Sequence, residues 1–185
     1  TILLVSDDDR SALACQLLAQ QREQRGQACL TVGPALSSRR DSPLPSITPQ
    51  IPLTLMDLLG HEQLNSASAV GVFNRRSDHL QRFTNAHREL ARLRGVRPAL
   101  IFSGPLKASL GDRLVHQLSD RQCCDLLMVP GERQRKDLEA ITQFWPESLT
   151  SPQIESTGLW FLPERPPLGG LNGGTPRPPH TLLAL

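Results

Sequence analysis

Three consecutive acidic residues, Asp7, Asp8 and Asp9, follow a short apolar run at residues 2–5. An aspartate can serve as a general base when burial or neighbouring groups tune its pKa, or as one oxygen ligand of a magnesium ion. A structural role is the alternative, because negative charge at the start of a helix beginning near Ser11 is stabilising by about 0.3–1 kcal/mol per charge. The residues alone leave these three roles open.

Two arginines, Arg75 and Arg76, stand before a helix expected from Ser77 onward. The free N–H groups and the dipole at a helix start favour an anion, and two guanidinium groups there could grip a phosphate. Seven arginines and only two acidic residues occur from Arg75 to Arg97, so a solvated cationic face is the alternative interpretation. Phe83 is the only aromatic residue in this stretch, which argues against a stacking platform for nucleic acid.

Small and polar residues also occur where three other apolar runs end. In an open α/β sheet, ligands bind beyond the carboxyl ends of the strands, and glycine lets the backbone approach a ligand closely. Ordinary turn formation is the alternative. The candidate substrate-binding residues of this kind are Ser6, Ser103, Gly104, Gly131 and Glu132, together with Arg75 and Arg76.

Several well-known site motifs are missing from the sequence. No G-x-G-x-x-G follows the first apolar run, and no Walker A lysine loop or G-x-S-x-G sequence occurs. The four cysteines form no C-x-x-C pair and the five histidines are scattered. These observations argue against a dinucleotide or P-loop enzyme, a serine hydrolase, a zinc site and a disulfide scaffold. We therefore expect no bound cofactor.

The candidate residues need elements to position them, and apolar runs alternate with helical patterns along most of the chain. This alternation predicts an α/β, Rossmann-like, doubly wound and mostly parallel sheet with helices on both faces. The run at residues 53–59 fits either a short helix or a strand. We expect strands at 2–5, 28–32, 69–73, 98–102, 126–129 and 158–162, and helices at 11–25, from 77 to about 94, around Leu110, Leu114 and Leu118, and after Gly131.

The composition predicts one domain at residues 1–162, interrupted by a Pro-, Ser- and Arg-rich loop at about 35–52. Residues 163–180 are rich in proline and glycine and are typical of a linker. The apolar residues 181–185 then suggest the start of a second domain, and a C-terminal tail that docks on the body is the alternative.

The charge balance and hydropathy favour a cytoplasmic protein. The net charge is +2, without the strong basic excess of a nucleic-acid-binding protein. No apolar run approaches the roughly 20 residues that span a bilayer, and residues 1–9 lack the pattern of a signal peptide. A peripheral membrane contact stays open, with no residue pattern that supports it.

The opening residues 2–9, ILLVSDDD, resemble those of a response-regulator receiver domain, and Asp57 could correspond to its phosphoacceptor residue. A receiver requires a lysine after its last strand, where this chain has Pro130 and Gly131. A non-catalytic receiver-like or small-ligand-binding regulatory domain is therefore the alternative to the resemblance described next.

A longer stretch resembles the N-terminal domain of a poorly characterised family of GT-B glycosyltransferases. The resemblance rests on four segments: residues 1–7 (TILLVSD), 97–105 (RPALIFSGP), 124–133 (CDLLMVPGER) and 158–164 (GLWFLPE). It implies a Rossmann-like domain that holds an acceptor while a second, C-terminal domain binds the nucleotide sugar. It also implies Asp7 or Asp8 as the general base, Arg75 and Arg76 as contacts to an anionic acceptor, and no bound metal.

Overall fold

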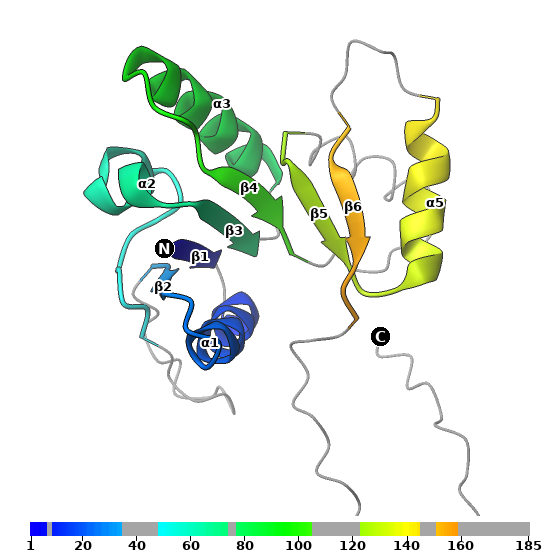
Figure 1. The fold of residues 1–185 in the computed structure, drawn as a ribbon, viewed down its shortest axis with the longest axis horizontal. Coiled ribbons are helices and arrows are strands. Elements are labelled where there is room, and N and C mark those ends of the chain that lie inside the picture. Colours follow the sequence, from blue (N-terminus) through cyan, green and yellow to red (C-terminus); the bar gives the residue numbers. More distant parts are fainter. Residues whose placement is uncertain (7–8, 35–47, 74–76, 105–122, 145–150, 159–185) are drawn as a thin grey trace, which may run out of the picture.

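The computed structural model describes residues 1–6, 9–34, 48–73, 77–104, 123–144 and 151–158 (Figure 1). The expected strand–helix alternation is present over these residues. The elements are β1 (Ile2–Ser6), α1 (Asp9–Glu23), β2 (Cys29–Val32), a 3-10 helix η1 (Asp57–Gly60), α2 (Glu62–Ser66), β3 (Ala69–Phe73), α3 (Ser77–Leu93), β4 (Leu100–Ser103), β5 (Leu126–Val129), α5 (Glu132–Thr142) and β6 (Gln153–Ser156).

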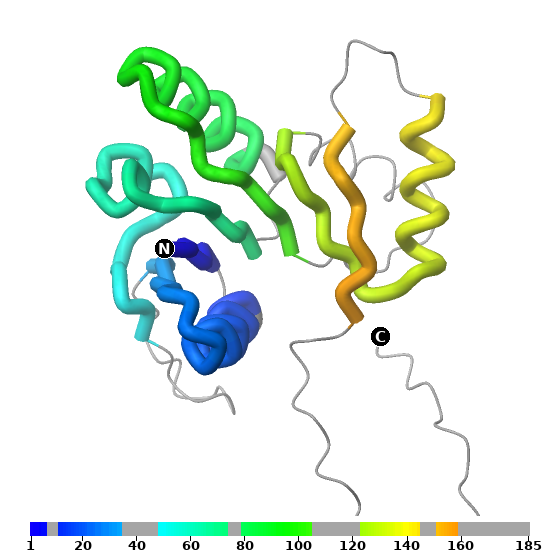
Figure 2. The backbone as a smooth tube through the Cα atoms, in the orientation of Figure 1, coloured from blue at the N-terminus to red at the C-terminus, as the bar shows by residue number. Residues whose placement is uncertain are grey.

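The strands form one six-stranded sheet in the order β2-β1-β3-β4-β5-β6. Every pairing in it is parallel. β1 lies inside the sheet between β2 and β3, as the course of the backbone in Figure 2 shows. The predicted α/β, Rossmann-like fold is therefore confirmed.

Successive residues of each strand point to opposite faces of the sheet. Each face packs against its own set of helices. On one face, which we call the α1 face, Leu4, Phe73 and Phe102 pack with Cys15 and Leu18 of α1. The opposite face, the α3 face, holds the larger cluster. Its strand residues pack with residues of η1, α2, α3 and α5, including Leu58, Leu64, Phe83 and Leu138.

The segment at Ile51 pairs with the outer edge of β2 and extends the sheet by a single bridge. Ile51 forms a parallel bridge with Val32, its N–H donates to Thr31 O at 3.0 Å, and Gly33 N–H donates to Ile51 O at 3.1 Å. The predicted loop at about 35–52 therefore ends in strand-like pairing. If this segment is counted as a rudimentary third strand, the strand order becomes 3-2-1-4-5-6-7, which begins with the Rossmann order.

The structure has a sixth strand, β6, at Gln153–Ser156, which was not expected there. Of the strand expected at 158–162, only Gly158 is described, with a φ of +71°. The ambiguous run at 53–59 ends in the 3-10 helix η1, and α2 was not expected. The helix predicted around Leu110, Leu114 and Leu118 and all of residues 159–185 lie outside the described residues.

Candidate functional site

The carboxyl ends of β1 and β3 lie side by side, with Ser6 paired to Phe73. From these ends the chain leads to α1 on one face of the sheet and to α3 on the other. This divergence of neighbouring connections is the switch point at which open α/β sheets bind ligands. Asp7 and Asp8 follow Ser6, while Arg75 and Arg76 follow Phe73 after one residue; all four lie outside the described residues.

Ser6 is buried at the end of β1, against the neighbouring strand β2. Its hydroxyl donates to the carbonyl oxygen of Val32 at 3.4 Å. A Cβ built at Gly33 would lie 2.8 Å from Ser6 Oγ and 3.1 Å from the Ser6 carbonyl oxygen. Glycine at position 33 is thus what allows β2 to approach this hydroxyl. The structure places Ser6 at the switch point, and its role in binding stays a prediction.

Ser103 and Gly104 end the next strand, on the other side of β3. Ser103 is 1% exposed and its hydroxyl points to the carbonyl oxygen of Val72 at 3.5 Å. The Gly104 N–H donates to the same carbonyl at 3.2 Å. A Cβ at Gly104 would lie only 2.0 Å from the ring of Phe73. The glycine therefore lets the chain leave β4 directly against an aromatic ring.

Gly131 and Glu132 lie farther along the same edge, where α5 begins. Gly131 is the N-cap residue of α5 and contributes no side-chain cap. Glu132 is exposed and accepts hydrogen bonds from Arg135 Nε at 2.9 and 3.1 Å. This contact with Arg135 lowers the pKa of Glu132. Since Arg135 also pairs with Glu139 at 2.6 Å, Glu132 belongs to an ion-pair network on the surface of its own helix.

A third hydroxyl at the edge, that of Thr157, was missed by sequence reasoning. The backbone N–H of Thr157 donates to Val129 O at 2.9 Å, and the Thr157 hydroxyl donates to the same oxygen at 3.3 Å. Thr157 thus repeats the arrangement of Ser6 and Ser103, in which a hydroxyl at a strand end meets a carbonyl of the neighbouring strand. The available signal was a Ser or Thr directly after or at the end of a strand, and it was hidden because β6 was not predicted.

The three hydroxyl contacts are long compared with the 2.7–2.8 Å typical of O–H···O bonds. These hydroxyls and the backbone N–H groups at the start of α5 give the described edge hydrogen-bonding groups for a polar or anionic ligand.

Comparison with protein-family models, curated proteins and solved structures found no match to this chain. Within the described ranges, no three His, Cys, Asp or Glu side chains gather as metal ligands. Burial raises the pKa of the Cys29 and Cys123 thiols, so neither is an activated nucleophile. In the same ranges, no helix has the length and apolar character to cross a bilayer.

The arginine-rich segment is largely engaged in contacts within the protein. These contacts are Arg88 with Asp125 at 2.7 Å, Arg92 with Glu89 at 2.6 Å, and Arg94 with Asn65. They fasten α3 to β5 and α2 or stabilise α3 itself. Three arginines of this segment are therefore engaged within the protein, and Arg75 and Arg76 are the pair nearest in sequence to the switch point.

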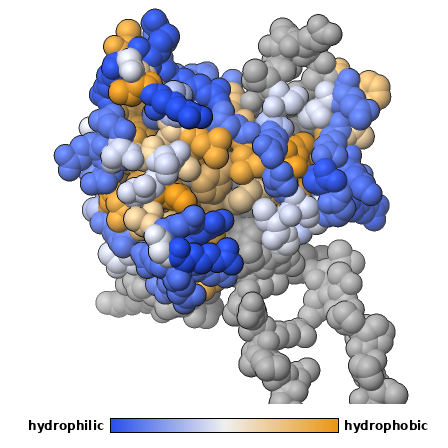
Figure 3. Space-filling model, in the orientation of Figure 1, coloured by the Kyte–Doolittle hydropathy of each residue, from blue (hydrophilic) through white to orange (hydrophobic). Residues whose placement is uncertain are grey.

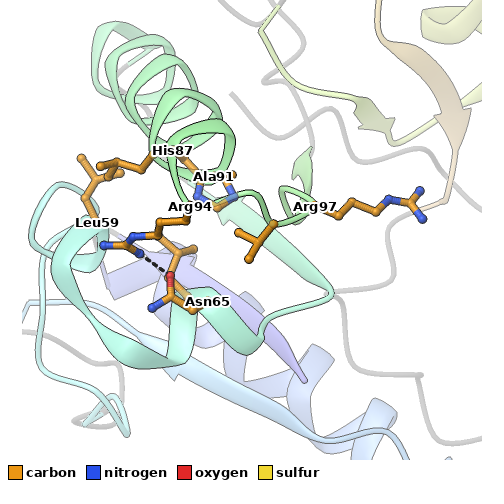
Figure 4. Close-up of a pocket in the computed structure, with 9 residues that line it drawn as sticks. Leu59, Asn65, His87, Ala91, Arg94 and Arg97 are labelled. Atoms are coloured by element: carbon orange, nitrogen blue, oxygen red, sulfur yellow. Dashed lines mark hydrogen bonds between the residues drawn. The ribbon is translucent and has the colours of Figure 1, made fainter.

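A small cavity lies between α3 and α2, near the opposite ends of the strands. Figure 4 shows His87 and Ala91 of α3 together with Arg94, which follows this helix and is hydrogen-bonded to Asn65, while Arg97 is directed away. The cavity volume is about 10 Å³, which is room for one water molecule at most. His87 is buried in this region and its pKa is lowered, chiefly by burial. The size of the cavity excludes it as a substrate site.

Proposed function

We propose that this chain is the acceptor-binding domain of a glycosyltransferase of the GT-B type, with the acceptor at the carboxyl edge between β1 and β3. The observation that carries the proposal is the pairing of Ser6 with Phe73 at the switch point. It brings the loops that contain Asp7 and Asp8 and Arg75 and Arg76 to neighbouring strand ends. The resemblance of the strand-end segments to that family supports the same assignment.

In this proposal the residues divide the work of transfer. Asp7 or Asp8 accepts the proton of the acceptor hydroxyl, whose oxygen attacks the anomeric carbon of the sugar as the nucleoside diphosphate leaves. Arg75 and Arg76 hold an anionic group of the acceptor, and the hydroxyls of Ser6 and Ser103 and the backbone at Gly104 hydrogen-bond its polar groups. A second domain binds the nucleotide sugar.

The position of Asp57 does not favour the receiver-like alternative. A phosphoacceptor aspartate must lie at the carboxyl end of a strand, beside the acidic residues that follow β1. Asp57 instead begins η1, and its Oδ2 accepts hydrogen bonds from the Thr54 hydroxyl at 2.6 Å and the Thr54 N–H at 3.3 Å. The carboxylate thus stabilises a turn before a short helix.

A glycan array probed with the whole chain tests the proposal. We expect binding to a defined set of glycans carrying anionic groups, and at least a tenfold weaker signal for Arg75→Ala/Arg76→Ala. The matched control, Arg82→Ala/Arg97→Ala, removes two exposed arginines elsewhere and is expected to bind as the wild type does. Asp7→Asn and Asp8→Asn are expected to keep binding, because their proposed role is in transfer.

Thermal unfolding with small ligands separates this function from its competitors. We expect no stabilisation by UDP, GDP or their sugars, because the donor is assigned to another domain. Stabilisation by a nucleotide sugar would contradict that assignment. Stabilisation by Mg²⁺ with beryllofluoride, lost in Asp57→Asn, would replace the glycosyltransferase with a receiver domain.

A further inference from the structure

The α1 face of the sheet is only partly covered by the helices that the structure describes. α1 packs over β1, β2 and part of β3. Figure 1 shows no described helix in front of β4, β5 and β6. A groove of about 500 Å³ lies along this face. Its sheet floor, which we call the open strip, consists of Ala69, Leu100, Phe102, Leu126 and Met128.

The open strip is apolar and accessible. Leu100 is 44% exposed, and Ala69, Leu126 and Met128 are half-buried. Figure 3 shows apolar side chains gathered in the middle of this face, with hydrophilic side chains on either side. Strands of all-parallel sheets are apolar throughout where both faces are covered. β5, with the sequence LLMV, has that composition, so its α1 face is suited to a covering element.

The width of the open strip matches one helix. On one side it is bounded by α1. On the other it ends at β6, where Ile154 belongs to the α3-face core and Gln153 and Glu155 therefore lie on the α1 face. Gln153 Nε2 donates to Glu155 Oε1 at 2.6 Å. The strip spans β3 to β5, about 10 Å at the usual strand spacing, and a helix is about 10–12 Å across.

The charges at the two borders differ in sign. Arg22 and Arg25, at the end of α1, line the groove with Gln21 and Gln27, and none of the described lining residues is acidic. Arg22 Nη1 also donates to Gln27 Oε1 at 3.1 Å, which holds its guanidinium at this border. The β6 border carries Glu155. A helix with carboxylates along the flank that faces α1 complements this pattern.

Connections within the chain are not expected to supply this helix. Residues 105–122 join β4 to β5, in the same direction along the sheet as the connection from β3 to β4 through α3. The general rule of right-handed crossovers predicts the α3 face for a connection of this kind. Residues 35–47 join β2 to the segment at Ile51, beyond β2. Residues 163–180 are too rich in proline and glycine to form a helix.

We infer that the open strip is a docking surface for one amphipathic helix supplied in trans, with an apolar face against Leu100 and Met128 and acidic residues facing Arg22 and Arg25. This surface lies on the face of the sheet, away from the residues that carry the proposed function. The inference does not depend on that function.

Selection from a display library tests the inference. The library presents 18-residue amphipathic helices with a constant apolar face and random flanking residues, and the whole chain is the target. We expect the recovered helices to be enriched in Asp and Glu on one flank. They are expected to bind at least tenfold more weakly to Leu100→Glu and to Met128→Glu, and at least fivefold more weakly to Arg22→Glu/Arg25→Glu.

Met56→Glu is the matched control, because Met56 is an exposed methionine beside η1, outside the strip. It is expected to bind as the wild type does, and circular dichroism verifies the fold of each variant. Recovery of no helix, or of helices indifferent to both Leu100→Glu and Met128→Glu, overturns the inference.

Two other occupants give distinct results. If residues 159–162 of the same chain cover the strip, Trp160→Ala/Phe161→Ala will bind the selected helices more tightly than the wild type does. If a second copy covers it, the mass in solution will rise with concentration for the wild type and not for Leu100→Glu. Either result overturns docking of a helix from a different partner.

Discussion

The Nε2 atom of His87 accepts a hydrogen bond from the backbone N–H of Ala99, 3.2 Å away at the approach to β4. The ring also stacks on Phe83 at a centroid distance of 5.8 Å. An acceptor nitrogen must be unprotonated, so this bond exists only with neutral imidazole. Burial and, to a lesser extent, the nearby Arg88 lower the pKa of His87, while Asp125 opposes the shift.

Stability is therefore expected to fall as the pH drops below about 6.5, the ordinary pKa of histidine. Between the folded and unfolded pKa values the unfolded chain binds more protons, so the contribution of His87 is complete above pH 6.5 and is lost at lower pH. Urea unfolding at pH 7.5 and pH 5 measures this loss. His87→Gln, which offers an uncharged acceptor, should lose less; an equal loss would contradict this assignment.

Asp125→Ala is expected to lower the free energy of unfolding by about 2 kcal/mol, because a buried N–H bonded to a charged group loses its acceptor. Asp125 Oδ2 accepts from the N–H of Ile101 at 2.8 Å, and Oδ1 accepts from Arg88 at 2.7 Å. The ion pair itself is more than a third exposed, so Arg88→Met should cost less than about 1 kcal/mol. Denaturant unfolding of both variants measures the two losses of free energy. A larger loss for Arg88→Met than for Asp125→Ala would contradict this prediction.

Gly104→Ala is expected to destabilise the fold by about 1–3 kcal/mol through overpacking. The new Cβ would meet Phe73, whose ring is held edge-on against Phe102 at 6.1 Å. Thermal unfolding measures the change, and Phe73→Leu in the same chain should recover part of it. Gly60→Ala is the control, because no atom lies within 4 Å of the added Cβ. An equal effect at both glycines would exclude a steric cause.

Thr84→Val is expected to stabilise the protein by about 1 kcal/mol. Thr84 is fully buried in α3, and its hydroxyl finds no hydrogen-bond partner in the structure described above. Burying an unsatisfied hydroxyl is unfavourable, and an apolar group of the same shape removes that penalty. Thr142→Val is the control, since the Thr142 hydroxyl donates to Glu139 O at 2.8 Å. Denaturant unfolding should show a gain for the first variant alone.

Much of the fold could be predicted because the buried strands are continuous apolar runs. β1, β3 and β5 were placed within one residue of their bounds on that basis. β6 was missed because polar and apolar residues alternate in an edge strand with one polar face. Only one of its four residues is a buried apolar residue, so the sequence shows no continuous apolar run there. The short α2 and the pairing of Ile51 depend on tertiary contacts and leave no periodicity in the sequence.

The sequence could predict at which edge of the sheet the candidate site lies, but not which contacts its residues make. The position of Ser6 and Ser103 at strand ends follows from a general rule for parallel sheets. The approach of Gly33 to Ser6 and of Gly104 to Phe73 depends on which strands are neighbours, and sequence order alone does not determine that. The engagement of Glu132 by Arg135 was readable from their three-residue spacing on a helix.

The interior position of β1 has a consequence for folding during synthesis on the ribosome. β2 can pair with β1 soon after it is made, but the other edge of β1 waits for β3, and 67 residues separate Thr1 from Ser68 where that pairing begins. At about 5–20 residues per second, this wait lasts roughly 3–13 seconds. Throughout it a nascent chain would present an unpaired apolar strand edge, the kind of surface that chaperones shield and that otherwise seeds aggregation.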